Sequence, residues 1–247
     1  MTDLIGRVVA ITGASSGIGE ATAIACARAG ATVALAARRE NRLESVAVRI
    51  RDAGGLVTTR VTDVSDQAQA RVFVEGAHAE HGRLDALVNN AGVMHLGRIE
   101  GAPLDEWRRM IDVNIMGVLY CTHAALPLMT AQGSGDIVMV SSVGGRVTPA
   151  FSGVYCLTKW GIGAFAEVLR KETIGRGVRV VVIEPGRVES ELRTHVRQEV
   201  LDELGPGFAE LVGMDADVVA RAIVLALAQP PDVSFSEILV RPTASAM

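Results

Sequence analysis

Tyr155 and Lys159 are the residues of this sequence whose types and spacing could do chemistry. The chain has only two tyrosines and two lysines, against twenty-two arginines, so a lysine here stands out. Four residues apart on a helix, the two side chains lie on one face and can converge. A phenol has an ordinary pKa of about 10, and a fixed ammonium beside it favours the phenolate. The pair therefore predicts proton transfer by Tyr155, and the alternative is a buried tyrosine beside a lysine that reaches solvent.

The elements that must position this pair alternate between apolar strands and helices. Expected strands are Val8–Thr12, Thr32–Ala37, Leu56–Val61, one ending near Asn89, Asp136–Ser142, Val178–Gly186 and Ser236–Val240. Expected helices are Gly17–Ala29, Arg42–Ala53, Gln67–His81, Asp105–Ala131 with a kink or division at Pro127, Val154–Ile174 and Val218–Ala228. This order predicts an α/β fold, one doubly wound Rossmann domain over residues 1–247, with about seven parallel strands and helices on both faces. Ligands bind such sheets at the carboxyl ends of the strands.

A glycine-rich loop, TGASSGIG, follows the first expected strand and opens the first expected helix. Glycines let a backbone turn tightly and approach a diphosphate, while the helix N-terminus offers free N–H groups and a positive dipole end. The loop therefore predicts a dinucleotide site. Its candidate cofactor residues are Gly13, Ser15, Ser16, Gly17, Ile18 and Gly19.

Three motifs together, TGxxxGIG, NNAG at 89–92 and YxxxK, resemble those of the short-chain dehydrogenase/reductase family. The match extends over essentially the whole chain. The resemblance implies an oxidoreductase that interconverts a carbonyl and an alcohol by hydride transfer with a nicotinamide cofactor. It also implies that Asn90, Ala91 and Gly92 contact this cofactor.

The resemblance assigns roles to four catalytic residues. Tyr155 is the general acid and base. Lys159 lowers the pKa of Tyr155 and binds the cofactor ribose. Ser142 polarises the substrate oxygen; Ser141 is the alternative, although strand alternation points the two serines in opposite directions. Asn114 holds a water that links it to the lysine, and a mid-helix asparagine among apolar residues needs a hydrogen-bond partner. Further cofactor contacts implied beside the nicotinamide are Pro185, Gly186 and Val188.

The end of the second strand indicates which cofactor is used. An NAD site needs a carboxylate there for the ribose 2′-hydroxyl, but the position holds Ala37, followed by Arg38 and Arg39. Because arginine binds phosphate through paired N–H groups, we expect NADP(H) to be preferred over NAD(H). The resemblance adds Asp63 as a partner of the adenine amino group and Val64 beside the ring.

The substrate pocket is expected between residues 93–98, 143–151 and the polar segment 187–213. We predict that Met94, Val143, Arg146 and Arg187 line it. That mixture suits a mostly apolar carbonyl compound, with an arginine available for a carboxylate. The sequence is also similar to NADP-dependent bacterial members of the family that act on aldehydes, β-hydroxy acids or secondary metabolites, clavulanate-aldehyde reduction among them.

Composition excludes several other functions. A net charge of −4 without a basic block argues against nucleic-acid binding, and no apolar run is long enough to cross a membrane. Three scattered cysteines and no leader favour a reduced cytoplasmic protein, and no metal site is expected. The family implies self-association, as a homotetramer or homodimer. A non-catalytic dinucleotide-binding scaffold or redox sensor is the alternative function.

Overall fold

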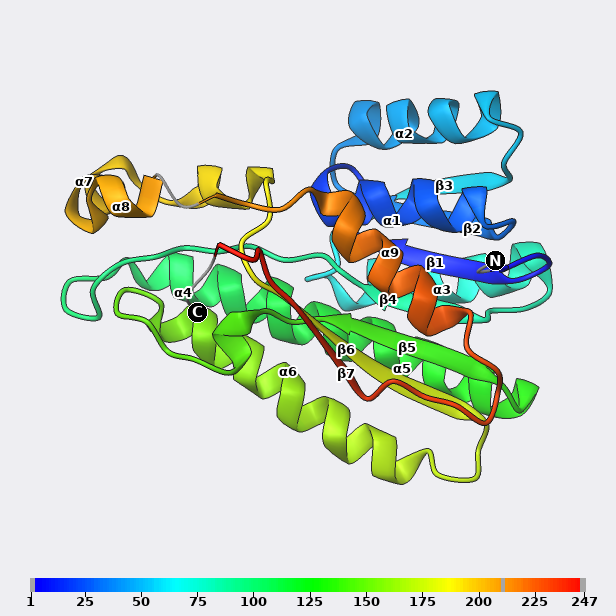
Figure 1. Ribbon diagram of the computed structural model, residues 1–247. Coiled ribbons are helices and arrows are strands. Elements are labelled where there is room, and N and C mark those ends of the chain that lie inside the picture. Colours follow the sequence, from blue (N-terminus) through cyan, green and yellow to red (C-terminus); the bar gives the residue numbers. More distant parts are fainter. Residues whose placement is uncertain (1–2, 210–211, 245–247) are drawn as a thin grey trace.

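Seven parallel strands form one sheet in the computed structural model, which describes residues 3–209 and 212–244 (Figure 1). The strand order is β3-β2-β1-β4-β5-β6-β7. The chain adds β2 and β3 on one side of β1 and the remaining strands on the other side, so the strand order switches between β1 and β4. The five central strands are buried at all or all but one of their residues, as a parallel sheet covered on both faces requires, whereas β3 and β7 at the two edges are partly exposed. The strands are β1 (Val8–Thr12), β2 (Thr32–Ala37), β3 (Val57–Val61), β4 (Ala86–Asn89), β5 (Gly135–Val140), β6 (Val178–Pro185) and β7 (Glu237–Val240).

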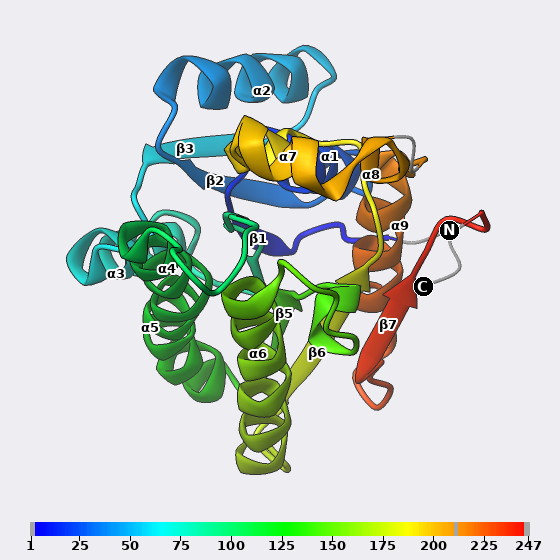
Figure 2. The ribbon, with the colours of Figure 1, turned by 90° about the vertical axis from the view of Figure 1, so that its left-hand side faces the viewer.

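Helices cover both faces of this sheet, and each layer has its own apolar core (Figures 1 and 2). One layer holds α1 (Gly17–Arg28), α2 (Glu40–Asp52) and α9 (Ala216–Leu227). The other holds α3 (Gln67–His81), α4 (Leu104–Ile111), α5 (Gly117–Gln132) and α6 (Gly153–Glu172). The predicted doubly wound single domain is confirmed, with element ends within a few residues of those expected.

The long helix between β4 and β5 differs from its prediction in one respect. Pro127 lies inside α5 without ending it, whereas the helix changes to a π-turn at Asp112–Met116, between α4 and α5. The whole stretch, Leu104–Gln132, is long and apolar enough to cross a membrane, but half of its most apolar part is buried in the molecule. Met110, Val113 and Met129 pack into the core beneath the sheet, so we interpret it as a core helix.

The chain after β6 forms a roof over the carboxyl ends of the strands. It comprises the 3-10 turn η3 (Glu191–His195) and the short helices α7 (Gln198–Leu204) and α8 (Pro206–Ala209). In Figure 1 these helices lie at the left-hand end of the molecule, and in Figure 2, where that end faces the viewer, they lie in front of the sheet. The predicted substrate segment 187–213 coincides with this roof, except for residues 210–211, which lie outside the described part of the chain.

Candidate active site

A cavity of about 640 Å³ opens beneath this roof, at the carboxyl ends of the strands. Its volume is that of a typical small-molecule site. One end, which we call the glycine-loop end, is walled by Gly13 and by residues 15–18, 37–39 and 62–64. The other, the outer end, is walled by Met94, Val143, Val147, Arg187 and Phe208. Tyr155 and Ser142 line the stretch between them.

The glycine loop is held by the strand-end motif beside it. The Asn90 side-chain amide donates to the carbonyl oxygens of Thr12, at 2.9 Å, and Gly13, at 3.2 Å. Gly13 has φ +65°, and a Cβ there would stand 2.8 Å from the Cα of Ala91. A Cβ on Gly19 would stand only 2.3 Å from the oxygen of Gly13. Only glycine permits this packing, which leaves the start of α1 facing the cavity.

Gly19 itself does not line the cavity, although the sequence analysis counted it among the cofactor contacts. It lies behind the loop, where its missing side chain lets α1 pack against Gly13. The other predicted loop residues, Gly13, Ser15, Ser16, Gly17 and Ile18, all lie on the cavity wall at the glycine-loop end. Ser16 precedes α1 but makes no side-chain cap, so its hydroxyl is available to other partners.

Tyr155 and Ser142 come together in the middle of the cavity. A side-chain hydrogen bond joins them, and each is less than a tenth exposed. Gly144 makes their meeting possible, because a Cβ there would lie 3.2 Å from Tyr155 Cε1 and 3.5 Å from Ser142 Oγ. Ser141 turns the other way and donates its hydroxyl to the carbonyl oxygen of Lys159 at 3.1 Å. The arrangement therefore favours Ser142 over Ser141 as the hydroxyl beside the phenol.

Lys159 is buried next to Tyr155. Its ammonium donates to the carbonyl oxygen of Val140 at 2.9 Å and lies 5.7 Å from the centre of the Tyr155 ring. Burial lowers the pKa of Lys159 to about 8 and raises the pKa of Tyr155 to about 12. The expected lowering of the tyrosine pKa by the lysine is thus absent here: burial is the largest influence on Tyr155, and the hydrogen bond with Ser142, which lowers its pKa, does not offset burial.

Asn114 lies in the π-turn and fixes the loop after β4. Its side chain accepts from Val93 N at 2.8 Å and donates to Val93 O at 2.9 Å and to Thr158 at 3.2 Å. The prediction that this buried asparagine needs partners is met by these bonds. A Cβ on Gly92 would lie 3.4 Å from Asn114 Oδ1 and 3.9 Å from Lys159 Nζ, so the two groups bracket Gly92. Asn114 itself does not line the cavity.

The arginines after β2 meet the glycine loop. Arg39 donates to Ser16 at 2.7 Å and to Ser15 at 3.2 Å, and it pairs with Glu191 at 2.7 Å. Arg42 also donates to Glu191. Neither Arg42 nor Glu191 was predicted from the sequence. The run ARRENR contained the only signal, because Arg42 stands one helical turn after Arg39.

Asp63 and Arg38 lie at the edge of the glycine-loop end. Asp63 accepts from the backbone and hydroxyl of Ser65, at 3.0 and 2.6 Å, and lies 3.4 Å from Arg109 and 3.9 Å from Arg38. Burial alone would raise the pKa of Asp63, but these hydrogen bonds and cations lower it overall. Val64 lies on the cavity wall beside it, and Arg109 is a wall residue that sequence reasoning missed.

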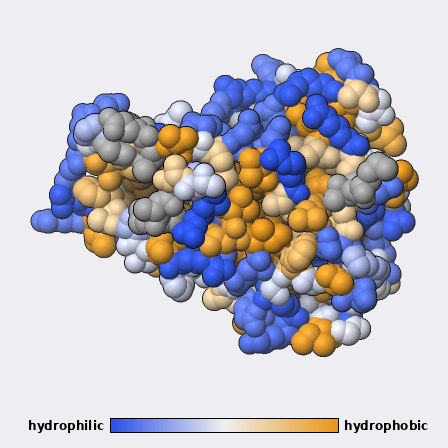
Figure 3. Space-filling model, viewed as in Figure 1, coloured by the Kyte–Doolittle hydropathy of each residue, from blue (hydrophilic) through white to orange (hydrophobic). Residues whose placement is uncertain are grey.

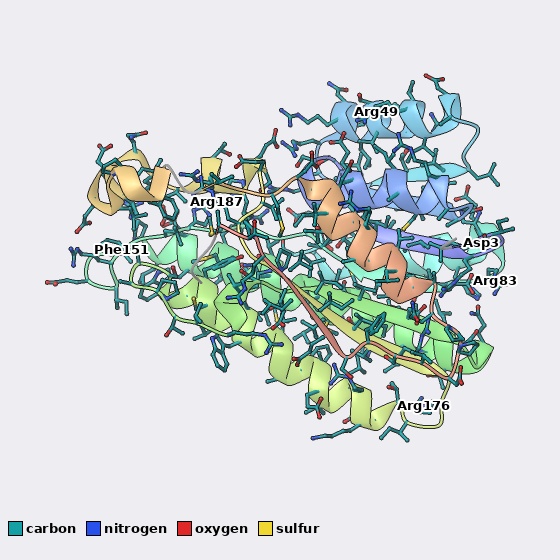
Figure 4. The ribbon with its side chains drawn as sticks, viewed as in Figure 1. Asp3, Arg49, Arg83, Phe151, Arg176 and Arg187 are labelled. Atoms are coloured by element: carbon teal, nitrogen blue, oxygen red, sulfur yellow. The ribbon has the colours of Figure 1, made fainter. Side chains whose placement is uncertain are left out.

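Arg146 does not line the cavity, so its prediction as a substrate residue is not supported. Its guanidinium binds Glu184 at 2.6 Å and also binds Glu237, at the ends of β6 and β7, outside the cavity. The prediction failed because strand pairing brings those two carboxylates together from distant parts of the chain. Phe151 also lies off the cavity, at the far end of the molecule, where Arg98 stacks over its ring at 5.1 Å (Figure 4).

The outer end of the cavity carries two arginines in the roof. Arg187 donates to the carbonyl oxygen of Phe208 at 2.6 Å, and Arg193 stands 4.8 Å from the centre of the Phe208 ring. Arg187 lies beneath the roof segment in Figure 4. Among the described residues of the wall, the acidic ones are Asp63 and Glu191, and both contact arginines of the glycine-loop end. The outer end thus combines the guanidinium groups of Arg187 and Arg193 with apolar walls from Met94 and Val143.

Comparisons with known proteins agree with this geometry. The sequence pattern of the short chain dehydrogenase family matches residues 7–201. The chain belongs to the short-chain dehydrogenase family. An uncharacterized oxidoreductase of Staphylococcus saprophyticus is 38% identical over 253 residues, covering all of both chains.

Solved structures of this family share the fold over nearly the full chain. An alcohol dehydrogenase of the archaeon Thermococcus sibiricus, complexed with 5-hydroxy-NADP, has a TM-score of 0.86 at 30% identity and covers 98% of both chains. A serine dehydrogenase complexed with NADP+ has a TM-score of 0.90 at 28% identity, covering 98% of this chain and 97% of its own. The glycine cradle and the serine and arginine donors of the present chain suit a nicotinamide dinucleotide.

Proposed function

We propose that this protein is an NADP(H)-dependent oxidoreductase that interconverts an aldehyde or ketone and its alcohol, with Tyr155 as the general acid and base. One observation carries the proposal: Tyr155, bonded to Ser142 and next to Lys159, lines the same cavity as the glycine loop. A site for a dinucleotide and a proton-transfer group therefore share one enclosed space. A dinucleotide-binding scaffold or redox sensor has no need of this second group.

Each side chain has a distinct task in the proposed reaction. A bound nicotinamide supplies the hydride for reduction or accepts it in oxidation. Ser142 donates its hydroxyl to the carbonyl oxygen, and Tyr155 gives its phenolic proton to the alkoxide that develops there. Even with its pKa raised to about 12, the phenol is a much stronger acid than an alcohol, so it can protonate the alkoxide. The ammonium of Lys159 places a positive charge beside the phenol. Asn114 lies on the other side of Gly92 from this ammonium.

The preference for NADP(H) rests on the residues after β2. Arg39 and Arg42 converge on one carboxylate, that of Glu191, and Arg39 also reaches the hydroxyls of Ser15 and Ser16. Two guanidinium groups and two hydroxyls form a donor set suited to a phosphate group. The NADP named in the solved relatives agrees with this assignment. Arg38 and Asp63 stand at the rim, where an adenosine would enter.

The guanidinium groups at the outer end support a substrate that carries a carboxylate. Arg187 and Arg193 flank Phe208 there, while Met94 and Val143 offer apolar surface. We therefore propose a small hydroxy acid and its oxo form, or a carboxylated aldehyde of secondary metabolism such as those reduced by clavulanate-type reductases. The size of the cavity suits a substrate of this class beside a dinucleotide.

We further propose a cytoplasmic enzyme that self-associates as a homotetramer or homodimer. Cys26, Cys121 and Cys156 are all free and buried, which suits a reducing compartment. Apolar side chains gather on the face that carries α9 and β7 (Figure 3), where Leu239 is 41% exposed. Leu157 and Trp160 of α6 are exposed as well, and such surfaces are typical of subunit contacts.

The proposal is tested by following NADPH absorbance with a panel of aldehydes, ketones and oxo acids. We expect consumption of NADPH with at least one class, fastest with carboxylated substrates, and much slower consumption of NADH. A protein that binds NADPH but turns over no member of the panel would be a scaffold or sensor. Equal rates with NADH, or faster ones, would contradict the proposed cofactor.

A further inference from the structure

Glu191 is an acidic residue in the middle of a cationic site. It begins η3 in the roof, and its carboxylate reaches across to the opposite wall of the cavity. One oxygen is 2.7 Å from Arg39, and the other binds Arg42. Arg39 at the same time donates to Ser15 and Ser16 of the glycine loop. The Glu191 carboxylate thus contacts the two arginines in the way that a bound phosphate group would.

The backbone beside Glu191 also lies against the glycine loop. A Cβ on Gly17 would be 3.3 Å from the Cβ of Ser190, which directly precedes Glu191. Ser190 and Glu191 therefore line the same part of the cavity as Gly17 and Arg39. A ligand that places an anionic group on Arg39 must move the Glu191 carboxylate away, because both need the same N–H donors.

We propose that Glu191 is a cofactor-selectivity residue, which occupies the 2′-phosphate site of the ligand-free enzyme and competes with NADP(H) for Arg39 and Arg42. The inference rests on the proposed preference for NADP(H). NAD(H) has a hydroxyl in place of the 2′-phosphate and makes no demand on these guanidinium groups. Glu191 therefore weakens the binding of NADP(H) but not that of NAD(H), and so reduces the difference between the affinities for the two cofactors.

The Glu191 carboxylate is ionised at neutral pH, because hydrogen bonds from Arg39 and Arg42 lower the pKa of Glu191 to about 2. The charged and titratable groups around it are these two arginines and His195, and Arg38 also acts on His195. Burial, His95 and the arginines lower the pKa of His195, so this ring is neutral at pH 8, where the titrations are run.

The test is calorimetric titration of wild type, Glu191→Gln and Glu191→Ala with NADP+, NAD+ and 2′,5′-ADP. Glutamine keeps the shape but removes the charge. Since exposed ion pairs are weak, we expect about fivefold tighter binding of NADP+ and 2′,5′-ADP and less than about twofold change for NAD+. Glu44→Gln is the matched control, because Glu44 lies on α2, pairs with Arg51 at 2.6 Å and is not bound to Arg39 or Arg42.

Unchanged or weaker binding of 2′,5′-ADP in both Glu191 variants would overturn the inference. An equal gain in affinity for NAD+ would also overturn it, because the substitution would then act through the overall charge or the conformation of the roof and not through the 2′-phosphate. If Glu44→Gln reproduced the gain, net charge would explain it and the inference would fall. A wild-type preference for NAD+ would instead count against the proposed cofactor, whereas the comparison on 2′,5′-ADP decides the role of Glu191 in either case.

Discussion

The ammonium of Lys159 lies 5.7 Å from the centre of the Tyr155 ring and 2.9 Å from the carbonyl oxygen of Val140. Both side chains are buried, Lys159 at 6% and Tyr155 at 8% exposure. A cation buried against an apolar sheet has a hydration cost that a surface lysine does not have. The pair is therefore placed for function at the expense of stability, a pattern that enzyme active sites share.

Replacing Lys159 with arginine should lower kcat/KM by at least about a hundredfold, by the scale of general acid–base effects. The guanidinium keeps the charge but is larger, and its planar fork does not fit the place of a compact ammonium beside Val140. Lys171→Arg is the control, since Lys171 is the second lysine and pairs with Glu167 on the surface at 3.2 Å. Steady-state kinetics check this, and a Lys159→Arg variant within about threefold of wild type would refute the role given to the ammonium.

The stability of the protein should depend on the titration of Lys159. Its pKa is lowered from 10.5 to about 8 in the fold, so between these values the unfolded chain holds a proton that the folded chain lacks. Stability then rises with pH in this window, by up to about 1.4 kcal/mol per pH unit. Thermal unfolding of wild type and Lys159→Met measures it: the Met variant should melt higher at pH 7, with the gap closing toward pH 10. A gap that does not change with pH would argue against a depressed lysine pKa.

Loss of the Tyr155 hydroxyl should remove turnover while leaving the cofactor site in place. We expect Tyr155→Phe to lower kcat by about a thousandfold or more and to change the Kd for NADPH by less than about threefold. Tyr120→Phe is the matched control, because Tyr120 is the other tyrosine and lies on α5 away from the cavity. Kinetics and fluorescence titration separate the two effects. Substantial activity in Tyr155→Phe would remove the phenol from the mechanism.

The two neighbouring serines should differ sharply when each is replaced by alanine. Ser142 bonds to Tyr155, whereas Ser141 donates to the carbonyl oxygen of Lys159. We expect Ser142→Ala to lower kcat/KM by about a hundredfold and Ser141→Ala by less than about fivefold. The same assay compares both variants, and a reversed order would mean that Ser141 faces the substrate.

Much of the fold and of the proton-transfer site could be predicted from sequence because the signals are local. The strands show as apolar runs, the glycine loop as a fixed spacing after β1, and the Tyr155–Lys159 pair as two positions on one helix face. These features depend on neighbours in sequence. They needed no knowledge of how distant segments pack.

The contacts of Glu191 and Arg146 could not be predicted because they join distant segments. Glu191 meets Arg39 across 152 positions, and nothing in either stretch signals the other. Arg146 was predicted for the substrate because its partners, Glu184 and Glu237, reach it only through the pairing of β6 with β7. The raised pKa of Tyr155 was missed for a related reason, since burial depends on the complete packing of the site.

Transfer of a labelled hydride tests the central claim most directly. NADPH carrying deuterium at the transferable position of its nicotinamide ring is incubated with the enzyme and the best carbonyl substrate of the panel, and the alcohol is analysed by mass spectrometry. We predict that the alcohol carries the deuterium on its carbinol carbon, that Tyr155→Phe yields almost none of this product, and that labelled NADH yields far less than NADPH. An alcohol without deuterium, or no alcohol from any carbonyl tested, would contradict the account.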